Sequence, residues 1–113
     1  MIINVASIAG YEGQMGQTVY SASKGAILGM TLPMARDLGK YKIRVMTIAP
    51  GIFKTPMGSN VQEKIVQMLV KTTPLGRLGD PREFALAVRS IIENPYASGT
   101  TWRLDAGIRL PYL

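Results

Sequence analysis

The sequence predicts an α/β fold built on a parallel sheet, and three stretches support this prediction. Two strand-like apolar runs, at Met1–Val5 and Ile43–Ile48, flank a stretch from about Thr18 to Leu38 whose apolar residues recur at helical spacing. A strand, a long helix and a second strand form a βαβ unit, whose strands are parallel and whose crossover is right-handed. The 113 residues, 47% of them hydrophobic, are enough for one domain with its own core.

The first strand and the segment after it have different patterns. Met1–Val5 is apolar apart from Asn4, which is typical of a strand buried on both faces. Residues 7–17 contain Gly10, Gly13 and Gly16, and they predict a loop.

The long helix has two unusual features. Pro33 lies inside it, and Gly29, four residues earlier, leaves room where the proline ring would clash with the backbone. Gly25, Ala26 and Gly29 form a stripe of small residues that lets another helix approach closely. The stripe fits packing within the chain and a subunit interface equally well. Gly39 is expected to end the helix with a glycine stop.

The second half of the chain alternates turns with regular elements. Ala49-Pro50-Gly51 is expected to break the second strand. Ser59 or Asn60 is expected to cap a helix. The apolar side of this helix comes from Val61, Ile65, Met68 and Leu69.

The last elements have the clearest local signals. Asp80-Pro81-Arg82-Glu83 provides an N-cap, a proline at the first helical position and an acid at the third, which predicts a helix over Pro81–Glu93. Thr100–Leu104 is expected to be the last strand, and Asp105-Ala106-Gly107 turns out of it.

Composition excludes several kinds of chemistry. The chain has neither His nor Cys, which rules out Ser-His-Asp and Cys-His nucleophilic sites, thiol redox chemistry and metal sites with His or Cys ligands. We expect no metal. Any catalysis must therefore come from Tyr, Lys, Ser or carboxylate groups.

Charge and hydropathy give weaker indications. The formal charge is +6, but the thirteen Lys and Arg residues are scattered, so direct nucleic-acid binding is not expected. No apolar run is long enough for a membrane span, and the start of the chain lacks the charged flank of a secretion signal. On these features alone, the expected location is the cytoplasm.

One helical turn carries the strongest chemical signal. Tyr20 and Lys24 are four residues apart, so both side chains lie on one helix face and can share a pocket. The Lys24 ammonium would favour the phenolate form of Tyr20. Ser7, thirteen residues before Tyr20, ends the first strand, and Pro50-Gly51 follows the second. Ligands of open α/β sheets bind at the carboxyl ends of the strands, where all of these residues fall.

These residues resemble the signature of the short-chain dehydrogenase/reductase family. That signature is a Ser, a Tyr-x-x-x-Lys thirteen residues later, and a Pro-Gly with Thr four residues after the Gly, here Thr55. The resemblance spans essentially all 113 residues. It implies the C-terminal half of a Rossmann-type doubly wound parallel sheet, with about three strands and flanking helices. The whole chain, 1–113, would be one partial domain.

The resemblance also implies a role for each residue. Tyr20 would be the general base, Lys24 would support it and bond the nicotinamide ribose, and Ser7 would hold the substrate oxygen. Substrate would therefore contact Ser7 and Tyr20. Cofactor would contact Tyr20, Lys24, Pro50, Gly51, Ile52, Phe53 and Thr55. Residues from about 53 to 73 would form the substrate flap.

Longer segments resemble one branch of this family. They are Met1–Ser7, Tyr20–Gly25, Thr31–Leu38, Arg44–Gly51 and Ile91–Pro95. The branch implies a mitochondrial-matrix homotetramer that uses NAD, with NADP not excluded, and acts on short-chain acyl-CoA and steroid alcohols. It also implies an association with mitochondrial tRNA processing, which the charge pattern does not require.

One departure from the family pattern changes the expectation. The phosphate-binding Gly-x-x-x-Gly-x-Gly of the N-terminal cofactor-binding half does not occur in this sequence, and Gly10, Gly13 and Gly16 have the wrong spacing for it. The first strand would lie in mid-sheet in the full fold, so alone it would expose an apolar edge. We therefore expect the isolated chain to bind NAD poorly and to lack dehydrogenase activity. The alternative is a non-catalytic truncated isoform that acts as an oligomerisation or interaction module.

Overall fold

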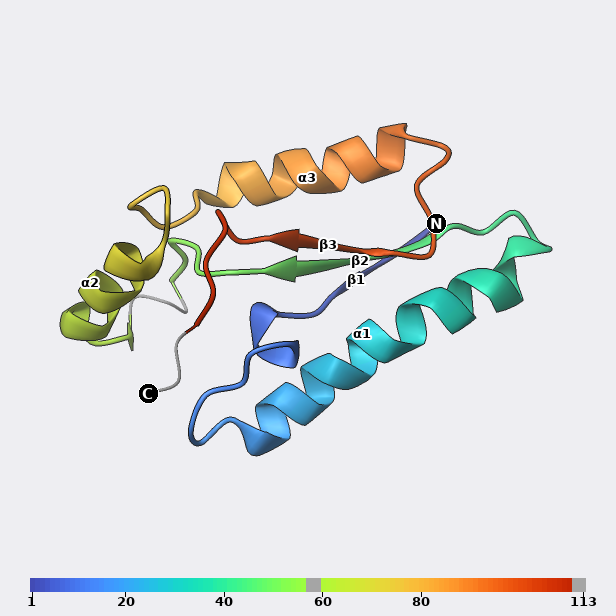
Figure 1. The fold of residues 1–113 in the computed structure, drawn as a ribbon. Helices are drawn as coiled ribbons and strands as arrows, with labels where there is room; N and C mark the ends of the chain where they lie inside the picture. Colours follow the sequence, from blue (N-terminus) through green and yellow to red (C-terminus); the bar gives the residue numbers. More distant parts are fainter. Residues whose placement is uncertain (57–59, 111–113) are drawn as a thin grey trace.

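The computed structural model describes residues 1–56 and 60–110 and confirms the α/β fold (Figure 1). Three parallel strands form one sheet in the order β1-β2-β3. Helix α1 lies on one face of the sheet and helix α3 on the other, while α2 stands apart beyond the carboxyl ends of the strands (Figure 1). The elements are β1 (Ile2–Val5), the 3-10 turn η1 (Ile8–Gly10), α1 (Thr18–Gly39), β2 (Val45–Pro50), α2 (Glu63–Thr72), α3 (Pro81–Glu93) and β3 (Thr101–Leu104).

The central strand β2 forms the core. Its residues 45–49 are each at most 4% exposed, because both neighbouring strands and both helix layers cover it. Alternate side chains of a strand point to opposite faces. Met46 and Ile48 pack with Ala87 and Ile91 of α3. On the other face, the Thr47 and Thr31 hydroxyls share a buried hydrogen bond of 2.7 Å, which ties β2 to α1.

Two strand predictions need correction. β1 is not buried on both faces: it lies at the sheet edge and pairs only with β2 among the described strands, and Val5 is 44% exposed. β2 runs from Val45 to Pro50, two residues later than predicted. It ends on Pro50, which still pairs in register with Leu104. A proline is tolerated at a strand end, where its missing N–H is not needed.

Helix α1 is continuous through Pro33, as predicted. The small residues of the stripe have different surroundings. Gly25 faces Gly10 of η1, whereas Ala26 is exposed and a Cβ at Gly29 would point into open space. The glycine stop at Gly39 is wrong, because Gly39 is the last helical residue and the left-handed conformation falls on Lys42, at φ 60°.

Two further predictions concern short segments. The predicted loop contains the ordered turn η1, at Ile8–Gly10. Helix α2 begins at Glu63 after Gln62, which makes no side-chain cap bond, so Asn60 does not cap it. Ser59, the other candidate cap, lies outside the described residues.

Helix α3 matches its prediction at both ends. Asp80 accepts a hydrogen bond from the Arg82 amide, and the Glu83 carboxylate reaches back to the Asp80 amide at 2.7 Å. Within residues 1–56 and 60–110, no helix combines the length and apolar character needed to cross a bilayer.

Candidate active site

The carboxyl ends of the three strands and the start of α1 lie at the same end of the molecule (Figure 1). Ser7 follows β1 by two residues, Gly51 directly follows β2, and Asp105 directly follows β3. This is the edge at which parallel α/β sheets bind ligands. The topology therefore places the predicted catalytic and cofactor residues on one side of the chain.

Ser7 is held by the turn that follows it. Its backbone is extended, and its Oγ accepts a hydrogen bond of 3.1 Å from the Ala9 amide, as the N-cap of η1. A hydroxyl can donate as well as accept, so this bond is compatible with donation to a substrate oxygen.

Tyr20 and Lys24 lie together, as the sequence predicts. Tyr20 is in the first turn of α1 and is 47% exposed. The Lys24 ammonium lies 5.8 Å from the centre of the Tyr20 ring and donates a hydrogen bond of 3.2 Å to the Val5 carbonyl. Lys24 thus links the phenol to the end of the strand that leads into Ser7. The catalytic roles of these residues remain predictions.

Close packing of η1 on α1 brings these elements together. A Cβ at Gly10 would lie 2.7 Å from the Leu28 side chain and 3.1 Å from the Lys24 backbone carbon. Any side chain at Gly10 would therefore push the Ser7 turn away from the helix that carries Tyr20.

The loop after β2, predicted to hold the nicotinamide, is also fixed by its backbone. The Gly51 amide donates to the Leu104 carbonyl at 2.9 Å, and a Cβ at Gly51 would lie 2.9 Å from the Asp105 Cβ. Phe53 forms a β-bridge with Gly79 and an edge-to-face contact with Phe84, with ring centres 5.9 Å apart.

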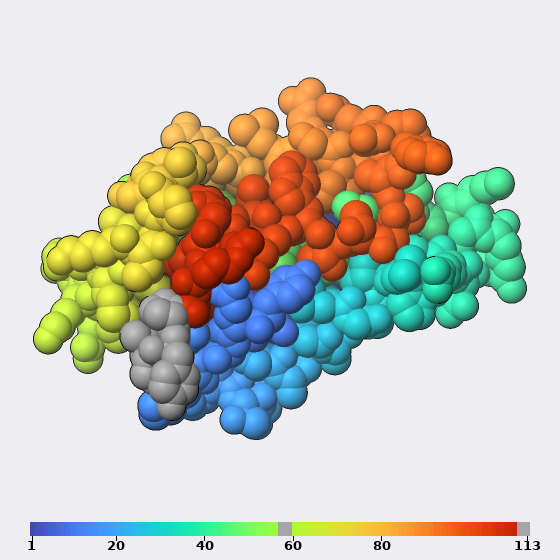
Figure 2. All heavy atoms as spheres, viewed as in Figure 1, coloured from blue at the N-terminus to red at the C-terminus, as the bar shows by residue number. Residues whose placement is uncertain are grey.

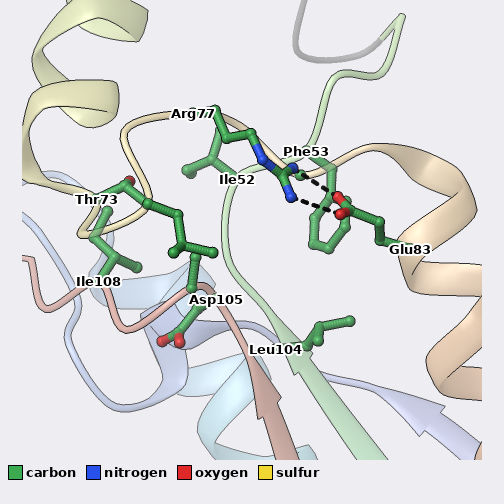
Figure 3. Close-up of a pocket in the computed structure, with 11 residues that line it drawn as sticks. Ile52, Phe53, Thr73, Arg77, Glu83, Leu104, Asp105 and Ile108 are labelled. Carbon is green, nitrogen blue, oxygen red and sulfur yellow. Dashed lines mark hydrogen bonds and ion pairs between the residues drawn. The ribbon is translucent and has the colours of Figure 1, made fainter.

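Two cavities adjoin this loop, and Ile52 and Phe53 line both. The larger has a volume of about 530 Å³ and lies between the loop and the predicted flap. It is lined by Ile52, Phe53, Lys54, Thr55, Pro56, Val61, Glu63, Val66, Leu69 and Leu78. The smaller, of about 190 Å³, lies between the loop, the Arg77–Glu83 ion pair and the segment after β3 (Figure 3). Among the described residues, Ser7, Tyr20 and Lys24 line neither of these two cavities.

A charged cluster near this edge was missed by the sequence analysis. The Arg103 guanidinium bonds the Glu12 carboxylate at 2.6 Å and the Asp105 carboxylate. Arg109 lies 3.7 Å from Glu12 and 3.3 Å from Asp105. No local pattern signals this cluster, because Glu12 and Arg103 are 91 residues apart.

Burial and pairing oppose each other in this cluster. Burial alone would raise the pKa of the Glu12 carboxyl, but hydrogen bonds from the Leu110 amide and Arg103 outweigh it, so the pKa lies below its ordinary value. Burial would lower the pKa of Arg103, and its bonds to Asp105 and Glu12 raise it instead. Both partners therefore stay charged at neutral pH.

The described part of the chain contains no group of three or more Asp, Glu, His or Cys side chains able to hold a metal ion. The predicted catalytic residues at the sheet edge, Ser7, Tyr20 and Lys24, carry hydroxyl, phenol and ammonium groups, which suit proton transfer.

A parallel sheet with Ser7 after one strand and Tyr20-x-x-x-Lys24 in the next helix defines a class of oxidoreductases, and comparison with known proteins agrees. A family model described as enoyl-(acyl carrier protein) reductase matches residues 1–109. The chain belongs to the short-chain dehydrogenase/reductase family.

Within this family, the chain is similar to several proteins that share one name. The chain is 56% identical to human 3-hydroxyacyl-CoA dehydrogenase type-2 over 111 residues, which is 97% of this chain and 42% of that protein. The protein of the same name from Drosophila melanogaster is 50% identical. The crystal structure of 3-hydroxyacyl-CoA dehydrogenase type-2 from Mycobacterium avium superposes with a TM-score of 0.91, at 45% identity, covering 96% of this chain and 43% of that one. The chain thus spans less than half the length of these relatives.

Proposed function

We propose that this chain is the catalytic part of an NAD-dependent dehydrogenase that oxidises a secondary alcohol to a ketone. The observation that carries the proposal is the Tyr20–Lys24 pair tied to the end of β1, next to the turn that holds Ser7. In the proposed reaction, the alcohol carbon loses a hydride, its hydroxyl proton passes to Tyr20, and a carbonyl group remains. Ser7 would hold the oxygen during this step, and Lys24 would support the phenolate.

The loop after β2 fits the nicotinamide end of the cofactor. Ile52 and Phe53 give it an apolar wall beside the larger cavity, and Thr55 adds a hydroxyl group. Bound NAD would supply the hydride acceptor. NADP has the same nicotinamide end and fits this loop equally well.

We further propose that the substrate is a 3-hydroxyacyl-CoA or a hydroxysteroid, in the mitochondrial matrix. The support is the likeness to proteins named 3-hydroxyacyl-CoA dehydrogenase type-2 and the larger cavity. Its volume of about 530 Å³ and lining by Val61, Val66 and Leu69 suit an apolar group. Residues from about 53 to 73, which include α2, would form the flap over it.

The test uses a hybrid protein, in which this chain replaces the aligned segment of the human relative and follows that relative's amino-terminal part. We call this protein the joined enzyme. It should reduce NAD in the presence of a 3-hydroxyacyl-CoA, and Tyr20→Phe should lower turnover at least about a hundredfold. Tyr41→Phe is the matched control, because Tyr41 also has a lysine, Lys40, 5.0 Å from its ring centre, but lies just beyond the far end of α1. A Tyr20→Phe variant with near-normal turnover would exclude Tyr20 as the base.

We also propose that subunits pair through the outer face of α1. Unlike a typical surface helix, α1 exposes apolar side chains on the side away from the sheet: Val19 is 83% exposed and Met30 37%. Ala26 and Gly29 between them leave room for a second helix. Ala26→Arg should separate the subunits and so lower the mass of the assembly that the joined enzyme forms, as measured by sedimentation velocity. An unchanged mass would place the interface elsewhere. The same face would serve a non-catalytic interaction module.

A further inference from the structure

The segment after β3 is clamped to the segment between Ser7 and Tyr20. The Glu12 carboxylate accepts a bond of 2.6 Å from the Arg103 guanidinium and one of 2.7 Å from the Leu110 amide. Arg103 also donates to Asp105 and to the Ile108 carbonyl. In Figure 2, the segment after β3, in red, packs directly beside the blue segment that precedes α1.

This cluster joins the ends of all three strands. Glu12 belongs to the segment after β1, and Arg103 and Asp105 lie at and after the end of β3. The Asp105 Cβ also packs against Gly51, which follows β2. The predicted substrate serine and the predicted nicotinamide loop are therefore connected through Arg103 and its partners, with Arg109 farther out, 64% exposed, beside the same two carboxylates.

The cluster is built to hold one geometry. The side chains of Glu12 and Arg103 are each 19% exposed and that of Asp105 is 6% exposed, so solvent screens them only weakly. A guanidinium presents its donors in a rigid plane, which fixes the directions to its acceptors. The Arg103 carbon Cζ also lies over the Tyr11 ring, 5.3 Å from the ring centre.

We propose that Glu12 and Arg103 are positioning residues: their bond sets the segment that carries Ser7 against the nicotinamide loop. This inference rests on the proposed function. Neither side chain would contact substrate or cofactor. They act through the backbone of residues 7–17, where a small displacement of a reacting group is costly for turnover.

The experiment compares three variants and one control variant in two proteins. Glu12→Gln, Arg103→Gln and their combination are made in the 113-residue chain and in the joined enzyme. Arg89→Gln is the matched control, because it breaks an Arg–Glu pair of similar length, 2.7 Å, whose side chains on α3 are 73% and 61% exposed. Amide hydrogen exchange is measured on the chain, and kcat and KM on the joined enzyme.

Glu12→Gln should speed exchange in residues 105–110 about tenfold, because the carboxylate that holds the Leu110 amide loses its charge. Each single substitution should lower kcat about tenfold and change each KM less than about twofold. The combined substitution should cost no more than the larger of the two single effects, because the Glu12–Arg103 bond is already lost in each single variant. Arg89→Gln should leave both readouts unchanged.

Other results overturn the inference in distinguishable ways. Faster exchange with unchanged kcat would mean that the Glu12–Arg103 bond has a structural role only. Unchanged exchange would show that the bond does not hold the segment after β3. A raised KM with normal kcat would point to binding rather than positioning. If the joined enzyme without substitutions has no turnover, the proposed function fails and the positioning role falls with it, while exchange still reports whether the bond clamps the segment.

Discussion

The amino-terminal ends of α1 and α3 are stabilised in opposite ways. α3 begins with a complete capping box between Asp80 and Glu83, a proline at its first position, and Arg77 bonded to Glu83 at 2.7 Å. α1 begins at Thr18 after Gln17, which makes no side-chain cap bond, and has no acidic residue in its first turn. The first helix turn of α3 is therefore fixed by its own neighbours in the sequence.

The start of α1 is held by distant parts of the chain. Lys24 bonds the Val5 carbonyl of β1, and η1 packs against the helix at Gly10. Farther along, Thr31 bonds Thr47 of β2. Because these contacts lie on the sheet side, Tyr20 in the first turn of α1 is 47% exposed. The first turn of α1, where chemistry is proposed, is therefore held by tertiary contacts, whereas the first turn of α3 is fixed by residues next to it in the sequence.

The largest effect should come from breaking the contact that anchors α1. Lys24→Met removes both the bond to the Val5 carbonyl and the cation beside Tyr20, and we expect turnover of the joined enzyme to fall at least about a hundredfold. Lys40→Met is the matched control, since Lys40 also lies over a tyrosine ring but at the other end of α1. It should keep turnover within about twofold of normal.

Equal losses for the two lysine variants would contradict the special role of Lys24. Such a result would mean that a lysine beside a tyrosine in or next to α1 matters only for helix stability. A Lys24→Met variant with normal turnover would remove the support for a Tyr20–Lys24 catalytic pair.

The two helices also differ in how well the sequence predicts them. The bounds of α3, Pro81–Glu93, match the prediction because every start signal lies within a few residues of the helix. β2 is displaced by two residues from its prediction because strand ends depend on pairing partners, here Val45 with Ile2 and Pro50 with Leu104. The burial of β1 on both faces was mispredicted for the same reason, because burial depends on which elements flank a strand, whereas its exposed edge is the one expected for the isolated chain.

In the candidate site too, features set by local sequence were predicted and features set by distant contacts were not. The Tyr20–Lys24 pair is visible in the sequence because the helix period alone places both residues on one face. η1 and the Glu12–Arg103 bond are not, because they depend on segments that meet only in the folded chain. The approach of the Ser7 hydroxyl to the Tyr20 phenol stays a prediction from the family pattern.

The smallest effect concerns the capped end of α3, and it depends on pH. A hydrogen bond from Arg77, together with one from the Asp80 amide, lowers the pKa of Glu83 from its ordinary 4.5 to about 2. A group whose pKa is lower in the folded state stabilises the fold above its unfolded pKa. The contribution of Glu83 should therefore be complete above pH 4.5 and should disappear as the pH falls through about 2.

Glu83→Gln isolates this contribution, because glutamine resembles the protonated acid at every pH. In urea unfolding, the midpoint of the original chain should exceed that of the variant at pH 7, and the gap should close between pH 4.5 and 2. The lowered pKa of Glu12 acts in the same direction but is present in both proteins, so it cancels in the difference. A gap that stays constant with pH would mean that Glu83 stabilises the start of α3 through packing rather than charge. The contrast between a charge-capped α3 and a packing-held α1 would then no longer stand.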